Sequence, residues 1–144
     1  MNILVTGATG NIGGSVVRSL LEKNYNIRSF TRNSESPSAL ALKNLGIEVV
    51  KGDYSDYESL VSAMMDMDTV FAVTTPFDDG AQGEIQQGLA LADAAKKTNI
   101  GHFIYSSVGS ADKNTGIPHF DSKNEIEKYI ISIGLPYTIS GPVF

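Results

Sequence analysis

The sequence predicts an α/β protein whose doubly wound parallel sheet has the strand order 3-2-1-4-5-6. Three observations point to this fold class. Short apolar runs alternate with helical patterns along the whole chain, and a glycine-rich turn joins the first strand to the first helix. The length of 144 residues suits one domain with a sizeable core. Such alternation is typical of βαβ units, in which helices cover both faces of a parallel sheet.

The first half of the chain supplies the three strands and two helices of one side of this sheet. Pro37 suits the first turn of the second helix, because the missing N–H has no partner there, and Gly46 ends that helix. The expected strands are Asn2–Thr6, Ile27–Thr31 and Ile47–Lys51, and the expected helices are Asn11–Lys23 and Pro37 to about Leu45.

The second half repeats the pattern with three helices and three strands. Asp56 or Ser55 caps a helix that carries Leu60, Val61 and Met64. A longer helix has its expected apolar face at Ile85, Leu89, Ala92 and Ala95. The expected strands are Thr69–Thr74, Gly101–Ser106 and Tyr137–Ser140, and the expected later helices are Gln82–Thr98 and about His119 to Ile131.

Composition excludes several classes of function. The net charge is −5 and no basic cluster occurs, so we expect no direct nucleic-acid ligand. Without cysteine there is no thiol nucleophile, disulfide or cysteine metal site, and we expect no metal. No apolar run is long enough to span a membrane, and the chain enters its first strand without a basic leader. We therefore expect a cytoplasmic protein.

The turn after the first strand has the glycine spacing of a diphosphate cradle. Gly7 allows the tight turn, Gly10 lets the backbone approach a ligand, and Gly13 lets the helix pack against the strand. The helix N-terminus that follows offers free N–H groups to an anion. The sequence therefore predicts a dinucleotide site, the alternative being a glycine turn without a ligand.

Arg32 favours NADP(H) over NAD(H). An NAD site usually places an acid at the end of the second strand for the ribose 2′-hydroxyl, whereas an NADP site has an arginine nearby for the 2′-phosphate. Here the strand leads through Thr31 to Arg32 and Asn33, with no acid among them. The alternatives are a solvated Arg32, or a contribution from Lys43 on the next helix.

Three further residues lie at or just after the ends of the third and fourth strands. Asp53 could accept a hydrogen bond from the adenine amino group, or could instead turn or cap the chain before the helix. Thr74 and Thr75 would line the cofactor riboses, unless they are exposed turn residues. All three are candidate cofactor contacts.

His119 and Lys123 are four residues apart and therefore share one helix face. Ile126 and Ile130 continue close to that face, which keeps Lys123 near the core side. Lys123 could hold a ribose hydroxyl or a substrate carbonyl oxygen. Alternatively, its stem lies along apolar surface while its amine reaches water.

The chain resembles the NmrA-like family of atypical short-chain dehydrogenases/reductases along its whole length. The resemblance rests on residues 6–14, on Arg32, on Gly52-Asp53, on the strand Phe103–Ser107 and on the Pro118–Lys123 stretch. It implies a Rossmann fold that binds NADP(H). The expected cofactor-binding residues are Gly7, Thr9, Gly10, Asn11, Ile12, Gly13, Arg32, Asp53, Thr74, Thr75 and Lys123, and the candidate catalytic residues are Lys123 and His119.

Two departures from the family pattern bear on catalysis. The Tyr-x-x-x-Lys pair of related dehydrogenases has His119 at the tyrosine position. Family members are usually longer, and Gly141 stands where they tend to place an arginine. We therefore expect residues 1–144 to form the dinucleotide-binding domain, without the C-terminal part that builds a substrate pocket.

The resemblance implies two functions. The first is a redox-responsive regulator that binds NADP(H) and changes its contacts with a protein partner. The alternative is an NADPH-dependent reductase of quinones or similar conjugated carbonyl compounds. A domain without its pocket-closing part could also pair as a homodimer.

Overall fold

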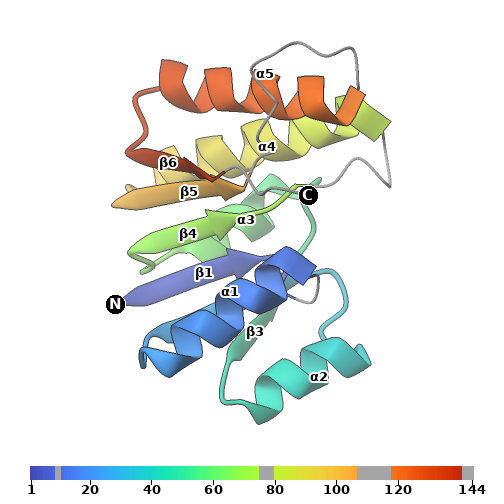
Figure 1. Ribbon diagram of the computed structural model, residues 1–144, viewed down its shortest axis with the longest axis vertical. Coiled ribbons are helices and arrows are strands. Elements are labelled where there is room, and N and C mark those ends of the chain that lie inside the picture. Colours follow the sequence, from blue (N-terminus) through green and yellow to red (C-terminus); the bar gives the residue numbers. More distant parts are fainter. Residues whose placement is uncertain (9–10, 75–79, 107–117, 141–144) are drawn as a thin grey trace.

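A computed structural model describes residues 1–8, 11–74, 80–106 and 118–140 of the chain. Its centre is a parallel sheet of six strands in the order β3-β2-β1-β4-β5-β6 (Figure 1). The strand order expected from the sequence is confirmed. β1 lies between β2 and β4. The sheet therefore grows from β1 to one side with β2 and β3, and to the other side with β4, β5 and β6.

The elements agree with those expected from the sequence, with shifts of up to two residues at their ends. The strands are β1 (Asn2–Thr6), β2 (Asn26–Thr31), β3 (Glu48–Lys51), β4 (Thr69–Ala72), β5 (His102–Ser106) and β6 (Tyr137–Ser140). The helices are α1 (Asn11–Glu22), α2 (Pro37–Asn44), α3 (Tyr57–Met64), α4 (Gly80–Lys97) and α5 (Pro118–Ser132).

The fourth strand ends two residues earlier than expected, at Ala72. The reason is a side chain: the backbone N–H of Val73 donates to Oγ1 of Thr6 at 2.8 Å. The Val73 N–H thus bonds to a side-chain oxygen and not to a backbone oxygen of the neighbouring strand. Of the two expected caps of α3, the side chain of Asp56 accepts from the backbone N–H of Ser59.

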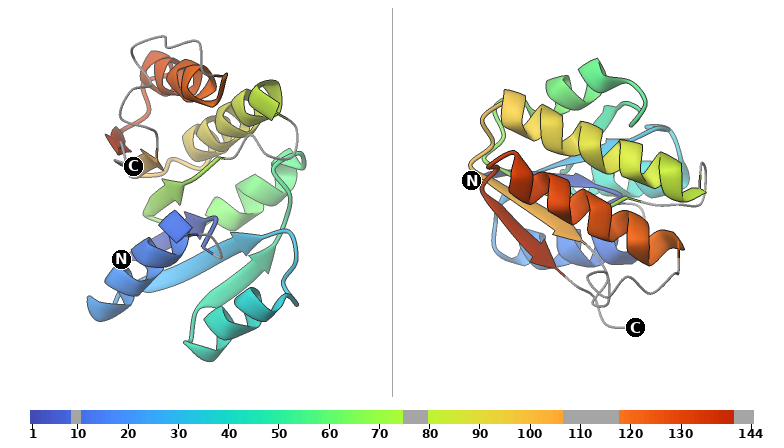
Figure 2. Two further views of the ribbon diagram at one scale, coloured as in Figure 1. Left: turned by 45° about the vertical axis from the view of Figure 1, so that its right-hand side comes forward. Right: turned by 90° about the horizontal axis from the view of Figure 1, so that it is seen from above.

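The helices cover the sheet from both sides (Figures 1 and 2). Helices α3, α4 and α5 lie on one face, where they enclose the larger core with inward side chains of the strands. Helices α1 and α2 lie on the other face and enclose a smaller core near β1, β2 and β3. The largest buried side chains of the first core include Leu4, Leu60, Met64, Leu91, Phe103, Tyr105, Ile126 and Ile130, and the second contains Ile3, Val5, Val17, Ile27, Leu42 and Ile47.

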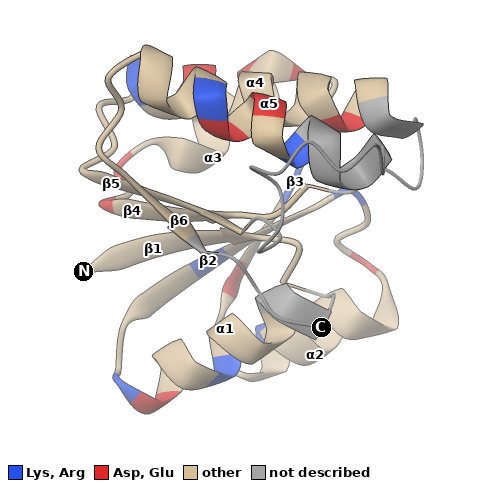
Figure 3. Ribbon diagram, turned by 45° about the horizontal axis from the view of Figure 1, so that its top comes forward, with Lys and Arg blue, Asp and Glu red and all other residues tan. Residues whose placement is uncertain are grey.

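Charged residues are interspersed on the helices, and the strands carry few of them (Figure 3). Both acidic and basic residues occur on α4 and α5 in this view, and the net charge of the chain is −5. A membrane-spanning helix would need a longer apolar stretch than any helix within the described ranges offers.

Candidate functional site

The site is built at the carboxyl ends of β1 and β4, where the strand order reverses direction. Ligands of open parallel sheets bind at such a point. Gly7 follows β1 with a φ of +67°, a conformation that L side chains rarely adopt, so the turn depends on glycine. A Cβ at Gly7 would lie 3.4 Å from Cβ of Val73, so the two chain segments also approach each other closely.

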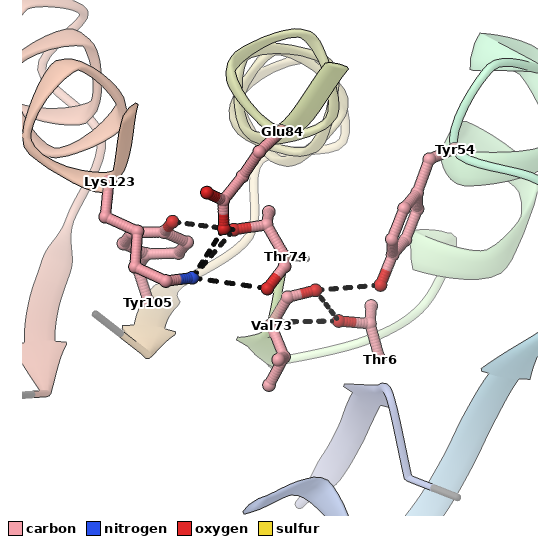
Figure 4. Close-up of polar contacts among 7 residues, drawn as sticks. All are labelled: Thr6, Tyr54, Val73, Thr74, Glu84, Tyr105 and Lys123. Carbon is pink, nitrogen blue, oxygen red and sulfur yellow. Dashed lines mark hydrogen bonds and ion pairs between the residues drawn. The ribbon is translucent and has the colours of Figure 1, made fainter. Parts of the chain in front are cut away.

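Four polar side chains meet in one buried network beside the end of β4 (Figure 4). Nζ of Lys123, from α5, lies 2.6 Å from Oε2 of Glu84, from α4. The same nitrogen donates to the backbone oxygen of Thr74 at 3.2 Å and to its Oγ1 at 3.3 Å. Oγ1 of Thr74 also contacts Oε2 of Glu84 at 2.9 Å and the hydroxyl of Tyr105, from β5, at 2.8 Å.

The directions of these hydrogen bonds follow from the number of protons. The Thr74 hydroxyl has one proton and donates it to the Glu84 carboxylate, so the Tyr105 hydroxyl must donate to Thr74. Burial raises the pKa of Tyr105 well above its ordinary value. Tyr105 therefore acts here as a neutral donor that orients Thr74.

The ion pair is withdrawn from water. Glu84 is fully buried and only 8% of Lys123 is exposed. Nζ of Lys123 also lies 5.8 Å from the centre of the Tyr105 ring. Of the two alternatives for Lys123, the solvent-facing amine is thereby excluded.

Tyr54 forms a second group of contacts at the same edge of the sheet (Figure 4). Its hydroxyl donates to the backbone oxygen of Val73 at 2.8 Å, beside Thr6. Its ring stacks on Phe30, with 5.7 Å between the ring centres. Burial raises the pKa of the Tyr54 hydroxyl. The Phe30–Tyr54 stack thus joins the end of β2 to the segment that follows β4.

Asp53 and Arg32 lie at the carboxyl ends of β3 and β2. Oδ1 of Asp53 accepts from the backbone N–H of Ser55 at 2.8 Å and from its hydroxyl at 2.7 Å. These hydrogen bonds lower the pKa of Asp53, and the positive charge of Arg32 lowers it further. Asp53 therefore makes the turn that was one of its two predicted roles, and the adenine contact stays a prediction. The exposed Arg32 lies close enough to act on its carboxyl.

The remaining predicted residues are placed only in part. Asn11, Ile12 and Gly13 form the first turn of α1, and His119 lies one turn before Lys123 on α5. The structure is described at these four positions for the backbone alone. Thr9, Gly10, Thr75 and Gly141 lie outside the described residues. Lys43 pairs with Glu35 at 3.5 Å.

Glu84 is the residue that sequence reasoning missed, and a signal for it existed. The apolar face expected for α4 included Ile85 and Leu89, which are half-buried. The other two residues of that expected face, Ala92 and Ala95, are fully buried. The buried stripe reaches them through Glu84, Gln87, Gly88 and Leu91, which are spaced at three- and four-residue steps. A charged residue on a helix face that is otherwise buried needs a partner.

A metal centre has no support in the part of the chain that the structure describes. Within those ranges, no three His, Asp or Glu side chains gather as metal ligands would. The buried network beside the end of β4 consists of a lysine, two hydroxyls and one carboxylate, and the lysine already pairs with that carboxylate. One paired carboxylate offers little to a metal cation, which prefers several oxygen ligands.

The comparisons with known proteins agree with this geometry. A model of the NmrA-like family matches residues 1–144. The photosystem II assembly factor Ycf39 of Cyanophora paradoxa is 36% identical in an alignment of 143 residues that covers 96% of this chain and 44% of that protein. The chain thus spans less than half the length of such curated relatives.

Two solved structures are similar in fold and sequence. The Citrobacter sp. triphenylmethane reductase complexed with NADP(H) is 30% identical with a TM-score of 0.87, over 96% of this chain and 48% of that one. The NADPH-dependent quinone oxidoreductase QOR2 of Escherichia coli, complexed with NADPH, is 29% identical with a TM-score of 0.83, over 95% and 47%. Both of these neighbours were solved with a nicotinamide dinucleotide bound.

Proposed function

The chain belongs to the NmrA-like family, and on that basis we propose that it binds NADP(H) and serves as a redox-responsive regulator. The observation that carries the proposal is the buried ion pair of Lys123 and Glu84, which holds an ammonium group at the end of β4. This is the point of the sheet at which open parallel α/β folds bind their ligands.

The three parts of the cofactor correspond to three parts of the carboxyl edge. Arg32 and Asp53, at the ends of β2 and β3, would hold the adenosine half, with the guanidinium on the 2′-phosphate. The turn at Gly7 and the N-terminus of α1 would hold the diphosphate. Lys123, beside Thr74, would face the nicotinamide half. When bound, NADPH supplies a hydride.

The Lys123–Glu84 pair supports binding rather than proton transfer. If Lys123 gave up a proton, the fully buried Glu84 carboxylate would lose its counter-charge. An uncompensated buried charge is costly, on the order of several kcal/mol. Lys123 is therefore suited to hold a ligand and poorly suited to protonate a product.

The second candidate is an NADPH-dependent reductase of quinones, dyes or similar conjugated carbonyl compounds. It is favoured by the similarity to the triphenylmethane reductase and to QOR2. Hydride transfer needs chiefly a held cofactor and a positioned acceptor. In this mechanism water supplies the proton, and Lys123 orients the cofactor.

One set of measurements separates the two roles. A redox-responsive regulator must bind NADPH and NADP⁺ with different affinity, or show different hydrogen exchange when one or the other is bound. The reason is that a ligand changes the balance between two conformations of a protein only if it binds one of them more tightly. We expect such a difference, together with no loss of nicotinamide absorbance when a quinone panel is added. Turnover that disappears in Lys123→Ala would favour the reductase. Equal binding and equal exchange with both redox forms would refute the regulator.

The protein partner and the homodimer remain predictions of this proposal. Light scattering of the purified chain with and without NADPH tests the homodimer directly. A mass that stays at one chain length under both conditions would contradict it.

A further inference from the structure

We infer that Glu84 is the positioning residue of the cofactor site, and that it orients Lys123 toward a ribose hydroxyl on the nicotinamide side. This inference rests on the proposed binding of NADP(H). It adds Glu84, a residue outside the expected site, as the group that fixes the orientation of Lys123.

The geometry explains why Lys123 needs such a residue. A lysine side chain is long and flexible, and holding it in one position costs conformational entropy. Here Oε2 of Glu84, 2.6 Å from Nζ, directs the ammonium group toward the end of β4. The backbone oxygen of Thr74, 3.2 Å away, holds it from a second direction.

Glu84 is itself held in place. Its Oε2 accepts the Thr74 hydroxyl proton at 2.9 Å, and Thr74 in turn accepts from Tyr105 at 2.8 Å. Tyr105 on β5 therefore donates to Thr74, and Thr74 donates to the Glu84 carboxylate on α4. The ammonium group of Lys123 on α5 contacts the same carboxylate oxygen, so this chain of hydrogen bonds fixes the position of Nζ (Figure 4).

The charge balance indicates the ligand. The ammonium of Lys123 is neutralised by Glu84 in a buried environment, so the pair has no net charge to offer a phosphate. A neutral hydroxyl is the better match. The longest contact of Nζ is the 3.3 Å one to Oγ1 of Thr74, and this is the hydrogen bond that a ribose hydroxyl could replace while the Glu84 contact stays.

The test compares two probes on the same variants. NADPH carries the nicotinamide ribose, whereas adenosine 2′,5′-bisphosphate carries only the adenosine half with its 2′-phosphate. The variants are Glu84→Gln, which keeps the shape and removes the charge, Lys123→Met, and the two together. Affinities are measured by calorimetry on the full chain.

We expect Glu84→Gln to weaken NADPH binding about tenfold or more, and to change bisphosphate binding by less than about twofold. In the Lys123→Met background, Glu84→Gln should weaken NADPH by less than about twofold further, since Glu84 acts only through Lys123. Equal weakening of both probes, unchanged NADPH binding, or a full additional loss in the Lys123→Met background would each overturn the inference.

Tyr129→Phe is the matched control. It removes a hydrogen bond from Tyr129 on α5 to Asp93 on α4, between the same helices but away from the carboxyl edge. It should lower stability and leave the ratio of the two affinities unchanged. If Glu84 had a purely structural role, Glu84→Gln would likewise lower stability and leave the ratio of the two affinities unchanged.

A second variant covers the case in which Glu84→Gln does not fold. Thr74→Val removes the hydroxyl that holds Glu84, and it leaves the ion pair itself in place. A loss confined to NADPH that is absent in the Lys123→Met background supports the inference, whereas an equal loss for both probes, or a loss that persists in that background, overturns it. If the unaltered chain binds neither probe, the proposed function itself is wrong, and this outcome is seen without any variant.

Discussion

Ile126 of α5 packs directly against Gly88 of α4, at a point where a larger residue would fit only if Ile126 moved. A Cβ at Gly88 would lie only 2.5 Å from Cδ1 and Cγ1 of Ile126. Gly88 is one turn beyond Glu84, and Ile126 is three residues beyond Lys123. The close approach of the two helices therefore sets the distance across which the ion pair forms.

Gly88→Ala should loosen this helix pair. An added methyl in a packed core typically costs about 1–3 kcal/mol, and the gain of about 1 kcal/mol in helix propensity offsets only part of that. We expect a lower midpoint of urea unfolding and weaker NADPH binding, because α5 must move away from α4.

Gly14→Ala in α1 is the control for that substitution. A Cβ there would meet the backbone oxygen of Ala8 at an ordinary 3.5 Å, so helix propensity should dominate and stability should not fall. If Gly88→Ala proved as stable as Gly14→Ala, the packing argument would be wrong.

Arg32→Ala should shift cofactor preference toward NADH. A guanidinium–phosphate contact is charge-assisted, so its loss should weaken NADPH binding about tenfold or more and NADH binding far less. Lys43→Ala is the control, because Lys43 already pairs with Glu35 and should change little. Equal losses for both nucleotides in Arg32→Ala would refute the 2′-phosphate assignment.

Gly52→Ala should disturb the stack of Phe30 and Tyr54. A Cβ at Gly52 would lie 2.7 Å from Cζ of Phe30 and 2.9 Å from Oγ of Ser59. The ring must move, at a cost of about 1–3 kcal/mol in stability. Near-ultraviolet circular dichroism should lose tyrosine signal, and a spectrum identical to that of the unaltered chain would contradict the prediction.

The lowered pKa of Asp53 predicts a pH-dependent contribution to stability. A carboxyl group whose pKa is lower in the folded chain stabilises it above the unfolded pKa of about 3.9, and this contribution is lost as the pH falls through the folded value. Asp53→Asn should therefore cost about 0.5 kcal/mol near pH 7, a small effect because water screens the partly exposed carboxyl. The difference from the unaltered chain should shrink below about pH 4.

An NMR titration of the Asp53 carboxyl checks the cause directly. Ser55→Ala removes one of the two donors to Oδ1, so the pKa of Asp53 should rise toward its ordinary value. An Asp53 that titrates at its ordinary value in the unaltered chain would disprove the prediction.

The fold was accessible from the sequence because its signals are local. The apolar runs, the glycine turn that begins at Gly7 and the helix starts at Pro37 and Asp56 each depend on a few neighbouring residues. Handedness and crossover rules then leave few ways to order six parallel strands. For the same reason, the sequence placed Arg32 at the end of a strand and Lys123 on the inner side of a helix.

Only the tertiary structure decided what Lys123 does there. Its counter-charge, Glu84, is 39 residues away in the sequence, and the network is completed by Thr74, just after β4, and by Tyr105 on the neighbouring β5. A charged residue on a helix is usually solvated, so local pattern alone gives Glu84 no partner. The pairing arises from how closely α4 and α5 pack at Gly88, and side-chain contacts across two helices are not encoded in either one alone.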